Sequence, residues 1–243
     1  MIRQINNNKL SLIGKTWKFD DKVAKNFDVH VAQSIPHYND LQNYLVQLSE
    51  WFLKDDEIIY DLGCSTGETI KKILKLKISS SFSIIGIDNN KKMITLARKK
   101  IQRFNKRNIR VEFKIEDVTK NIKFKKSNLF YSILLFPFFN YNQRLKVLKN
   151  IYSSLNIGGA LISVEKVRSS SSHFEDILNQ LYFDFKLKKN LSEKEILQKA
   201  KSLRSSMYIY DEKTLFKSLK DAGFKKTEVF FKCFNFIGYI AIK

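Results

Sequence analysis

Short apolar runs alternate with amphipathic stretches along most of the chain. Apolar runs of strand length lie at 57–63, 83–88, 111–117, 129–135 and 160–165. Apolar residues at helical spacing lie between them, over about 68–76, 90–104 and 142–155, the last stopped by Gly158-Gly159. Strand and helix thus alternate five times, which is typical of a parallel, doubly wound sheet.

The C-terminal part breaks this alternation. Helices are expected over about 173–189, 193–206 and 214–222, followed by apolar segments at 227–233 and 236–242. Only two residues join those segments, so they must form an antiparallel hairpin, because parallel strands need a long crossover. The pattern predicts an α/β protein with a Rossmann-like class I methyltransferase fold: a seven-stranded, mostly parallel sheet with a C-terminal antiparallel hairpin. We expect one domain over 1–243, with an N-terminal lid (1–55) and a helical insertion (about 171–206).

Composition narrows the classes of protein. The chain has 243 residues, three histidines and two cysteines, Cys64 and Cys233, so it carries neither a disulfide framework nor the His/Cys spacing of a metal site. No apolar run approaches the roughly 20 residues of a membrane helix. Residues Met1 to Ser11 lack the apolar stretch of a signal peptide. We expect a cytoplasmic protein without a bound metal or a membrane partner.

The formal net charge of +20 invites a nucleic-acid interpretation. Only eight of the 44 basic residues are Arg, however, and the lysines are scattered along the chain. RNA recognition typically gathers Arg forks and aromatic stacking platforms in a cluster. We therefore do not expect direct nucleic-acid binding, and we attribute the charge to solvated faces.

A glycine motif follows the first predicted strand, in the stretch Tyr60-Asp61-Leu62-Gly63-Cys64-Ser65-Thr66-Gly67. Glycines at a strand-to-helix turn let the backbone approach a ligand closely. The spacing differs from the G-x-G-x-x-G of dinucleotide folds, and the motif lacks the basic residue of a P-loop. The carboxylate of Asp61 and the amides of the turn suit the charged amino-acid end of a sulfonium cofactor, S-adenosylmethionine.

Acids also end the next two predicted strands. Asp88 ends the second and is placed to accept hydrogen bonds from both ribose hydroxyls of such a cofactor. Asp117 ends the third and is placed for the adenine amino group, with Val118 beside the ring. Taken singly, each could be a strand-end acid facing water. Three acids in this order favour an S-adenosylmethionine site.

The same glycine motif also fits G-x-S-x-G, the nucleophile elbow of hydrolases, with Ser65 as the nucleophile. That chemistry needs a histidine base late in the chain. The one later histidine, His173, lies at a polar, Ser-rich helix start. The hydrolase interpretation is therefore disfavoured.

Several segments together identify a family. They are Phe19-Asp20-Asp21-Lys22-Val23-Ala24, Ser34-Ile35-Pro36-His37-Tyr38, Tyr60-Asp61-Leu62-Gly63-Cys64-Ser65, Gly86-Ile87-Asp88-Asn89, Leu155-Asn156-Ile157-Gly158-Gly159-Ala160-Leu161, Glu165-Lys166, Asp184-Phe185-Lys186 and Phe231-Lys232-Cys233-Phe234-Asn235-Phe236. From about Trp17 to the C-terminus the chain resembles the carboxy-S-adenosyl-L-methionine synthase family of the class I methyltransferase superfamily. The resemblance implies cofactor contacts from Tyr38, Gly63, Cys64, Ser65, Asp88, Asn89, Asp117 and Val118.

The resemblance also implies an activity and partners. Members of that family transfer carbon dioxide from prephenate to the methyl group of S-adenosylmethionine and release phenylpyruvate. A partner enzyme then uses the carboxylated cofactor to modify wobble uridine in tRNA. The family is homodimeric, so the resemblance implies a homodimer here.

Two positions depart from the family. Ile133 stands where the family has Asn, and Ala200 where it has an Arg that pairs with the added carboxylate of the cofactor. Ala cannot replace the bidentate fork of Arg. The neighbouring cations Lys199, Lys201 and Arg204 are the candidates to take its place, although adjacent helical residues point about 100° apart.

The expected reaction follows from these two departures from the family. We expect an S-adenosylmethionine-dependent methyltransferase that acts on an unidentified small molecule. The sulfonium is already an activated electrophile, so we assign no catalytic residue. The alternatives are authentic carboxy-S-adenosylmethionine synthesis with a shifted basic partner, and a protein that binds the cofactor without turnover. The residues Ile133, Phe136, Phe138 and Phe139 either line an apolar acceptor site or belong to the core.

Overall fold

A computed structural model describes residues 21–77, 80–104, 108–204 and 206–243. Seven strands form one sheet in the order β3-β2-β1-β4-β5-β7-β6. They are β1 (Ile58–Leu62), β2 (Phe82–Asp88), β3 (Ile109–Ile115), β4 (Ser127–Ile133), β5 (Leu155–Lys166), β6 (Lys226–Cys233) and β7 (Phe236–Ile242). The first five strands pair in parallel, and β7 is antiparallel to both β5 and β6. The predicted fold class and C-terminal hairpin are confirmed.

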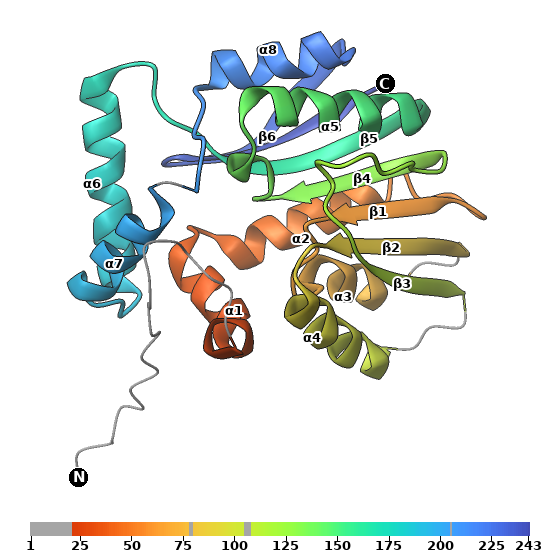
Figure 1. Cartoon of the computed structure of the whole chain (residues 1–243), viewed down its shortest axis with the longest axis horizontal. Helices are drawn as coiled ribbons and strands as arrows, with labels where there is room; N and C mark the ends of the chain where they lie inside the picture. Colours follow the sequence, from red (N-terminus) through yellow and green to blue (C-terminus); the bar gives the residue numbers. More distant parts are fainter. Residues whose placement is uncertain (1–20, 78–79, 105–107, 205) are drawn as a thin grey trace.

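Two groups of helices cover the sheet (Figure 1). On one face, α2 (Tyr38–Ser49), α3 (Glu68–Lys75) and α4 (Lys91–Ile101) pack their buried residues against β1 and β2. On the other face, α5 (Tyr141–Ser154) and α8 (Glu212–Ala222) pack against β4, β5 and β7. Short 3₁₀ helices lie at η1 (Gln102–Phe104) and η2 (Phe136–Phe138). None of these described helices is long and apolar enough to span a membrane.

Three further helices stand beyond the edge toward which the parallel strands point (Figure 1). They are α1 (Asp21–Ser34), α6 (Ser172–Lys188) and α7 (Glu193–Leu203). The buried side chains Ile35, Tyr182 and Phe236 form a small cluster there, against which Tyr38 also packs. Because ligands of open α/β sheets bind outside the carboxyl ends of the strands, these helices are positioned to border the site.

The structure corrects two boundaries of the sequence analysis. Gly158-Gly159 does not stop the helix: α5 ends at Ser154, and β5 begins at Leu155, which is fully buried and extended. The glycines instead lie in an irregular start of β5, where a Cβ on Gly159 would come within 3.0 Å of the Asn128 carbonyl oxygen. The other correction concerns Asp117, which lies two residues beyond the end of β3.

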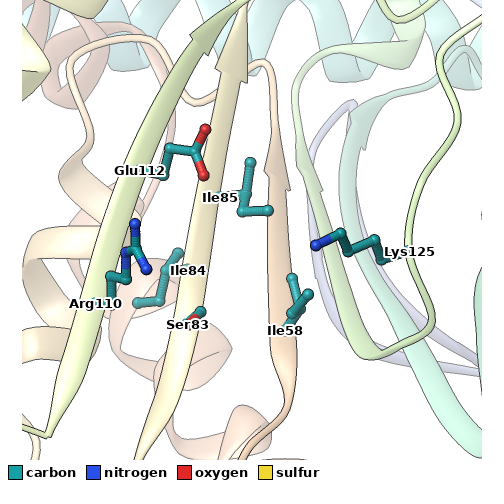
Figure 2. A pocket seen from close by; sticks show the side chains of 7 residues that line it. All are labelled: Ile58, Ser83, Ile84, Ile85, Arg110, Glu112 and Lys125. Carbon is teal, nitrogen blue, oxygen red and sulfur yellow. The ribbon is translucent and has the colours of Figure 1, made fainter.

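The chain passes from β3 to β4 through residues 116–126 without a helix. This segment leaves a cavity of about 220 Å³ open on the sheet face opposite α3 and α4 (Figure 2). Its lining comes from Ile58, Ser83, Ile84, Ile85, Arg110, Glu112 and Lys125. Most of these residues belong to the amino-terminal halves of β1, β2 and β3, so the cavity lies away from the carboxyl edge.

Candidate cofactor site

The glycine turn after β1 is held by backbone geometry. Gly63 and Gly67 have φ of +69° and +75°, a region that glycine adopts without strain. A Cβ on Gly63 would lie 3.0 Å from Leu135 Cδ1. The N–H groups of Gly63 and Cys64 donate to the Ile87 carbonyl, at 2.8 and 3.0 Å. Two amides that the sequence analysis offered to the cofactor are thus already bonded to β2.

Asp61 is the buried acid of this turn. Its side chain lies in β1 with 2% exposure, and within the described part of the chain its Oδ2 has no hydrogen-bond partner. Burial, and then the charge of Asp88, raise the pKa of Asp61 to about 7. A buried carboxylate is stabilised by a nearby positive charge. The amino and sulfonium groups of S-adenosylmethionine carry such charges, so this residue fits the cofactor.

Asp88 ends β2 with its carboxylate fixed by two backbone donors. Ser65 N–H donates to Oδ2 at 3.0 Å, and Asn90 N–H donates to Oδ1 at 2.8 Å. Burial raises the pKa of Asp88, whereas these two hydrogen bonds lower it. Each carboxylate oxygen keeps a lone pair for a ribose hydroxyl. Asn90 also caps α4 through its side chain, and Asn89 lies exposed between the two.

Asp117 and Val118 follow directly beside that acid. Ile115 pairs with Asp88 across the β2–β3 ladder, and Thr119 donates to Asp117 Oδ1 from its N–H and its hydroxyl, at 3.0 and 2.7 Å. Val118 is buried in the core. Both positions therefore follow the strand partner of Asp88, which is where the predicted adenine site would lie.

Tyr38 joins the turn from the first residue of α2. Its hydroxyl accepts a hydrogen bond from Gln42 Nε2 at 3.1 Å, and Gln42 Oε1 accepts one from Thr69 Oγ1 in α3 at 3.1 Å. Burial raises the pKa of Tyr38, and the charges of Asp28, Glu68 and Asp61 add to this shift. The structure therefore brings Tyr38, Asp61, Asp88 and Asp117 to one edge of the sheet.

Sequence reasoning missed the contacts that fasten α1 over the turn. Lys100 Nζ in α4 lies 2.5 Å from Asp28 Oδ2 and 3.0 Å from Thr66 Oγ1. Thr66 Oγ1 also donates to Asp28 Oδ1 at 2.5 Å. These partners are 34 to 72 residues apart, and no spacing rule on a single sequence links them.

Three lysines gather at the same end of the sheet, and we call them the lysine cluster: Lys166 at the end of β5, Lys186 in α6 and Lys199 in α7. Lys199 Nζ lies 2.7 Å from His30 Nε2 and 2.9 Å from Ser34 Oγ. The Nζ atoms of Lys186 and Lys166 lie 3.7 and 5.1 Å from the ring centroid of Tyr182. The Tyr182 hydroxyl donates to the Ser34 carbonyl at 2.8 Å, which connects the three.

The electrostatics of the lysine cluster follow from burial and repulsion. Burial lowers the pKa of both Lys186 and Lys199 to about 7, with repulsion from the other lysines adding to the shift. Burial, and then Lys199, lower the pKa of His30 to about 4. Burial also lowers the pKa of Lys166, while the charge of Glu175 raises it. Positive charge is thus concentrated where water is scarce.

The position of Lys199 distinguishes it from the other two cations that were candidates to replace the Arg of the family. Lys199 turns inward to α1, whereas Lys201 and Arg204 are exposed. Sequence reasoning named Lys199 as a candidate cation. It noted Lys166 and Lys186 only within segments that carry the family resemblance, and it gave neither a role in the site.

The four apolar residues considered as the lining of an acceptor site differ in how deeply they are buried. Phe136 and Phe139 are buried in the core, with 0% and 7% exposure, so packing explains them. Ile133 and Phe138 are half-buried and pack against the edges of the core. The core interpretation therefore holds for the first two residues.

Asp88→Ala is expected to weaken S-adenosylmethionine binding at least about tenfold, because charge-assisted hydrogen bonds to the ribose are lost. Calorimetry on wild type and variant measures this. Glu50→Ala, which changes an exposed acid after α2, is the matched control. Equal affinity of the Asp88→Ala protein and wild type would show that Asp88 does not bind the ribose.

Comparisons with known proteins place the chain in a family. The model of the ubiE/COQ5 methyltransferase family matches residues 17–242. A carboxy-S-adenosyl-L-methionine synthase of Staphylococcus epidermidis is 34% identical over 228 residues, covering 93% of this chain and 97% of its own. One from Sulfurimonas denitrificans is 35% identical over 231 residues, covering 95% and 96%.

Solved structures share the fold. Human N-acetylserotonin methyltransferase in complex with SAM has a TM-score of 0.60 at 14% identity, over 91% of this chain and 55% of its own. A SAM-dependent methyltransferase from Methanosarcina mazei has a TM-score of 0.55 at 19% identity, over 80% and 94%. The protein is therefore an S-adenosylmethionine-dependent transferase that belongs to the ubiE/COQ5 methyltransferase family and is a relative of the carboxy-S-adenosyl-L-methionine synthases.

Proposed function

We propose that the protein is a carboxy-S-adenosyl-L-methionine synthase, the second of the activities expected from its sequence. In this reaction prephenate loses its ring carboxylate and its hydroxide to become phenylpyruvate. The carbon dioxide is bonded to the methyl carbon of the cofactor, and the displaced methyl proton leaves with the hydroxide as water. The relatives that carry this name match nearly the whole chain, which supports the proposal.

The observation that carries the proposal is the inward position of Lys199. The reaction adds one negative charge to the cofactor, and a buried carboxylate needs a cationic partner. Ala200 removes the Arg fork of the family, and Lys199, one residue earlier, places an ammonium group against His30 and Ser34 of α1. Lysine offers a point charge rather than a fork, so we expect weaker discrimination than Arg gives.

The test is turnover of S-adenosylmethionine with prephenate. Phenylpyruvate should form, detected by its enol absorbance, together with a cofactor heavier by one carbon dioxide.

Lys199→Ala should lower kcat/KM about 100-fold through loss of a charge-assisted hydrogen bond. Lys201→Ala, which changes an exposed lysine of the same helix, is the control. Ala200→Arg in the Lys199→Ala background should restore part of the activity. A wild-type protein that releases no phenylpyruvate would refute the proposal.

Methyl transfer to a small molecule is the second candidate. It is favoured by Ile133 and Ala200, which place apolar side chains where the family has polar ones. In that event S-adenosylhomocysteine accumulates with a suitable acceptor and no phenylpyruvate appears. A protein that binds the cofactor tightly and yields neither product would match the non-catalytic alternative.

Two organisational expectations are part of the proposal. Residues 21–55 act as a lid, which the contacts of Lys100 with Asp28 support for α1. Residues 1–20 of the expected lid lie outside the described part of the chain. The protein also works as a homodimer, as the resemblance implies. Light scattering on the eluting protein tests the homodimer, and a mass of one chain would refute it.

A further inference from the structure

The lysine cluster contains more positive charge than one cofactor carboxylate requires. Lys186 is buried in α6, and Lys166 ends β5. In the part of the chain that the structure describes, no ion pair joins either of these two to a carboxylate. Buried charges without a counter-charge are costly, and a bound anion relieves that cost.

The surroundings of these two lysines are aromatic. Both ammonium groups lie over the ring of Tyr182, which packs edge-on against Phe236 at 5.3 Å between centroids. Phe185 and Phe234 lie next to them, with ring centroids 6.4 Å apart. Such surroundings suit an anion attached to an apolar or aromatic body better than a fully hydrated inorganic anion.

We propose that Lys166 and Lys186 form a second subsite, separate from Lys199, that binds a carboxylate of an aromatic or cyclic co-substrate and selects it. This inference rests on the proposed function for its role in turnover. Each subsite binds a different anion. Lys199 binds the carboxylate on the cofactor, and Lys166 and Lys186 bind the carboxylate of the co-substrate. Lys166 and Lys186 are thereby specificity-determining residues.

The subsite is titratable, because it uses lysine and not arginine. Its charge is greatest below a pH of about 7, where Lys186 is protonated, and it falls as the pH rises through that value. An anion raises the pKa of the lysine that it contacts, so binding takes up a proton near neutral pH. The titratable groups that face or influence the cluster come from four elements. They are Lys166 from β5, Glu175, Tyr182 and Lys186 from α6, Glu195 and Lys199 from α7, and His30 from α1.

The experiment measures equilibrium binding of phenylpyruvate to the full chain saturated with S-adenosylmethionine. Lys186→Met, close in length and without charge, should weaken binding about tenfold or more. Lys188→Met, which changes an exposed lysine of the same helix, should leave it unchanged. Lys186→Arg should keep the affinity and flatten its decline with rising pH, since Arg stays charged. Inorganic sulfate should bind at least about tenfold more weakly, because it has no apolar body to bury.

The outcomes separate this inference from the proposed function. Binding that depends on Lys186, in a protein that makes no carboxylated cofactor, supports the subsite and refutes the synthase. Synthase activity with an unchanged KM for prephenate in the Lys186→Met protein refutes the subsite alone. Absence of phenylpyruvate binding to wild type, equal losses in Lys186→Met and Lys188→Met, or equal affinity for sulfate would also overturn it. The pH dependence of wild-type binding adds a readout without any variant: the affinity should fall as the pH rises through the range in which Lys186 loses its proton.

Discussion

Arg144→Met is expected to destabilise the protein by about 3–5 kcal/mol, the cost of leaving one member of a buried ion pair without its partner. Arg144 is 1% exposed, and its Nη1 and Nη2 donate to Glu165 Oε2 and Oε1 at 2.6 and 2.7 Å. Its Nε donates to Ser218 Oγ at 2.8 Å, which adds α8 to the pair. In the variant, Glu165 keeps the Tyr239 hydroxyl, at 2.5 Å, as a donor but loses its counter-charge.

Urea unfolding with and without the second substitution tests this. The double variant Arg144→Met, Glu165→Gln should recover part of the loss, because neither charge then remains buried. Lys146→Met, which changes an exposed lysine of the same helix, should stay within about 0.5 kcal/mol of wild type. A loss below about 1 kcal/mol for Arg144→Met would show that Glu165 is neutral or well solvated in the native state.

The same pair has a consequence for the site. Glu165 immediately precedes Lys166, and the Arg144 guanidinium stacks over Phe136, 4.8 Å from its ring centroid. The pair therefore fixes both the end of β5 and the segment that follows β4. Local loosening in the Arg144→Met protein should displace Lys166 before the sheet itself unfolds.

The sequence predicted the sheet because its signals were local. Each parallel strand is a short apolar run, and the two-residue join between β6 and β7 permits only a hairpin. Asp61, Asp88 and Asp117 were predicted to lie together because the strand ends of a parallel sheet meet at one edge. The prediction that Gly158-Gly159 stops a helix was wrong. Glycine is common after helices, but these two residues lie in the irregularly paired start of β5.

The lysine cluster could not be predicted in the same way. Lys166, Lys186 and Lys199 belong to three different elements, and the chain has 44 basic residues from which to choose. Only burial against α1 and Tyr182 distinguishes them from lysines on solvated faces. The same limit applies to Arg144 and Glu165, whose burial depends on how α5 and α8 pack on β5 and β7.

Asp61→Asn is expected to stabilise the cofactor-free protein and to abolish most of its cofactor binding. Burial raises the pKa of Asp61 from 3.8 to about 7. The folded state therefore holds this proton more tightly than the unfolded state does. The contribution of Asp61 to stability is full below the unfolded pKa, and it is lost as the pH rises to about 7. The full shift corresponds to on the order of 4 kcal/mol.

Above that pH the wild-type protein carries a buried carboxylate, which asparagine removes. The Asp61→Asn protein should then be more stable than wild type by on the order of 2–4 kcal/mol at alkaline pH. It should have nearly the same stability as wild type below about pH 4, where Asp61 is protonated in both states. Chemical unfolding across this pH range measures the difference. A variant that is less stable than wild type at alkaline pH would mean that Asp61 accepts a structural hydrogen bond there.

Cofactor binding should show the opposite preference. The positive charges of S-adenosylmethionine favour ionised Asp61, so binding lowers its pKa and releases a proton near neutral pH. The affinity of wild type should rise with pH up to about 7 and then level off. Calorimetry in buffers of different ionisation enthalpy counts the proton. Asp61→Asn should lower the affinity for the cofactor about 100-fold. The same variant should abolish both the proton release and the pH dependence of binding. Proton release that persists in Asp61→Asn would assign the titration to Asp88, whose pKa is also raised by burial.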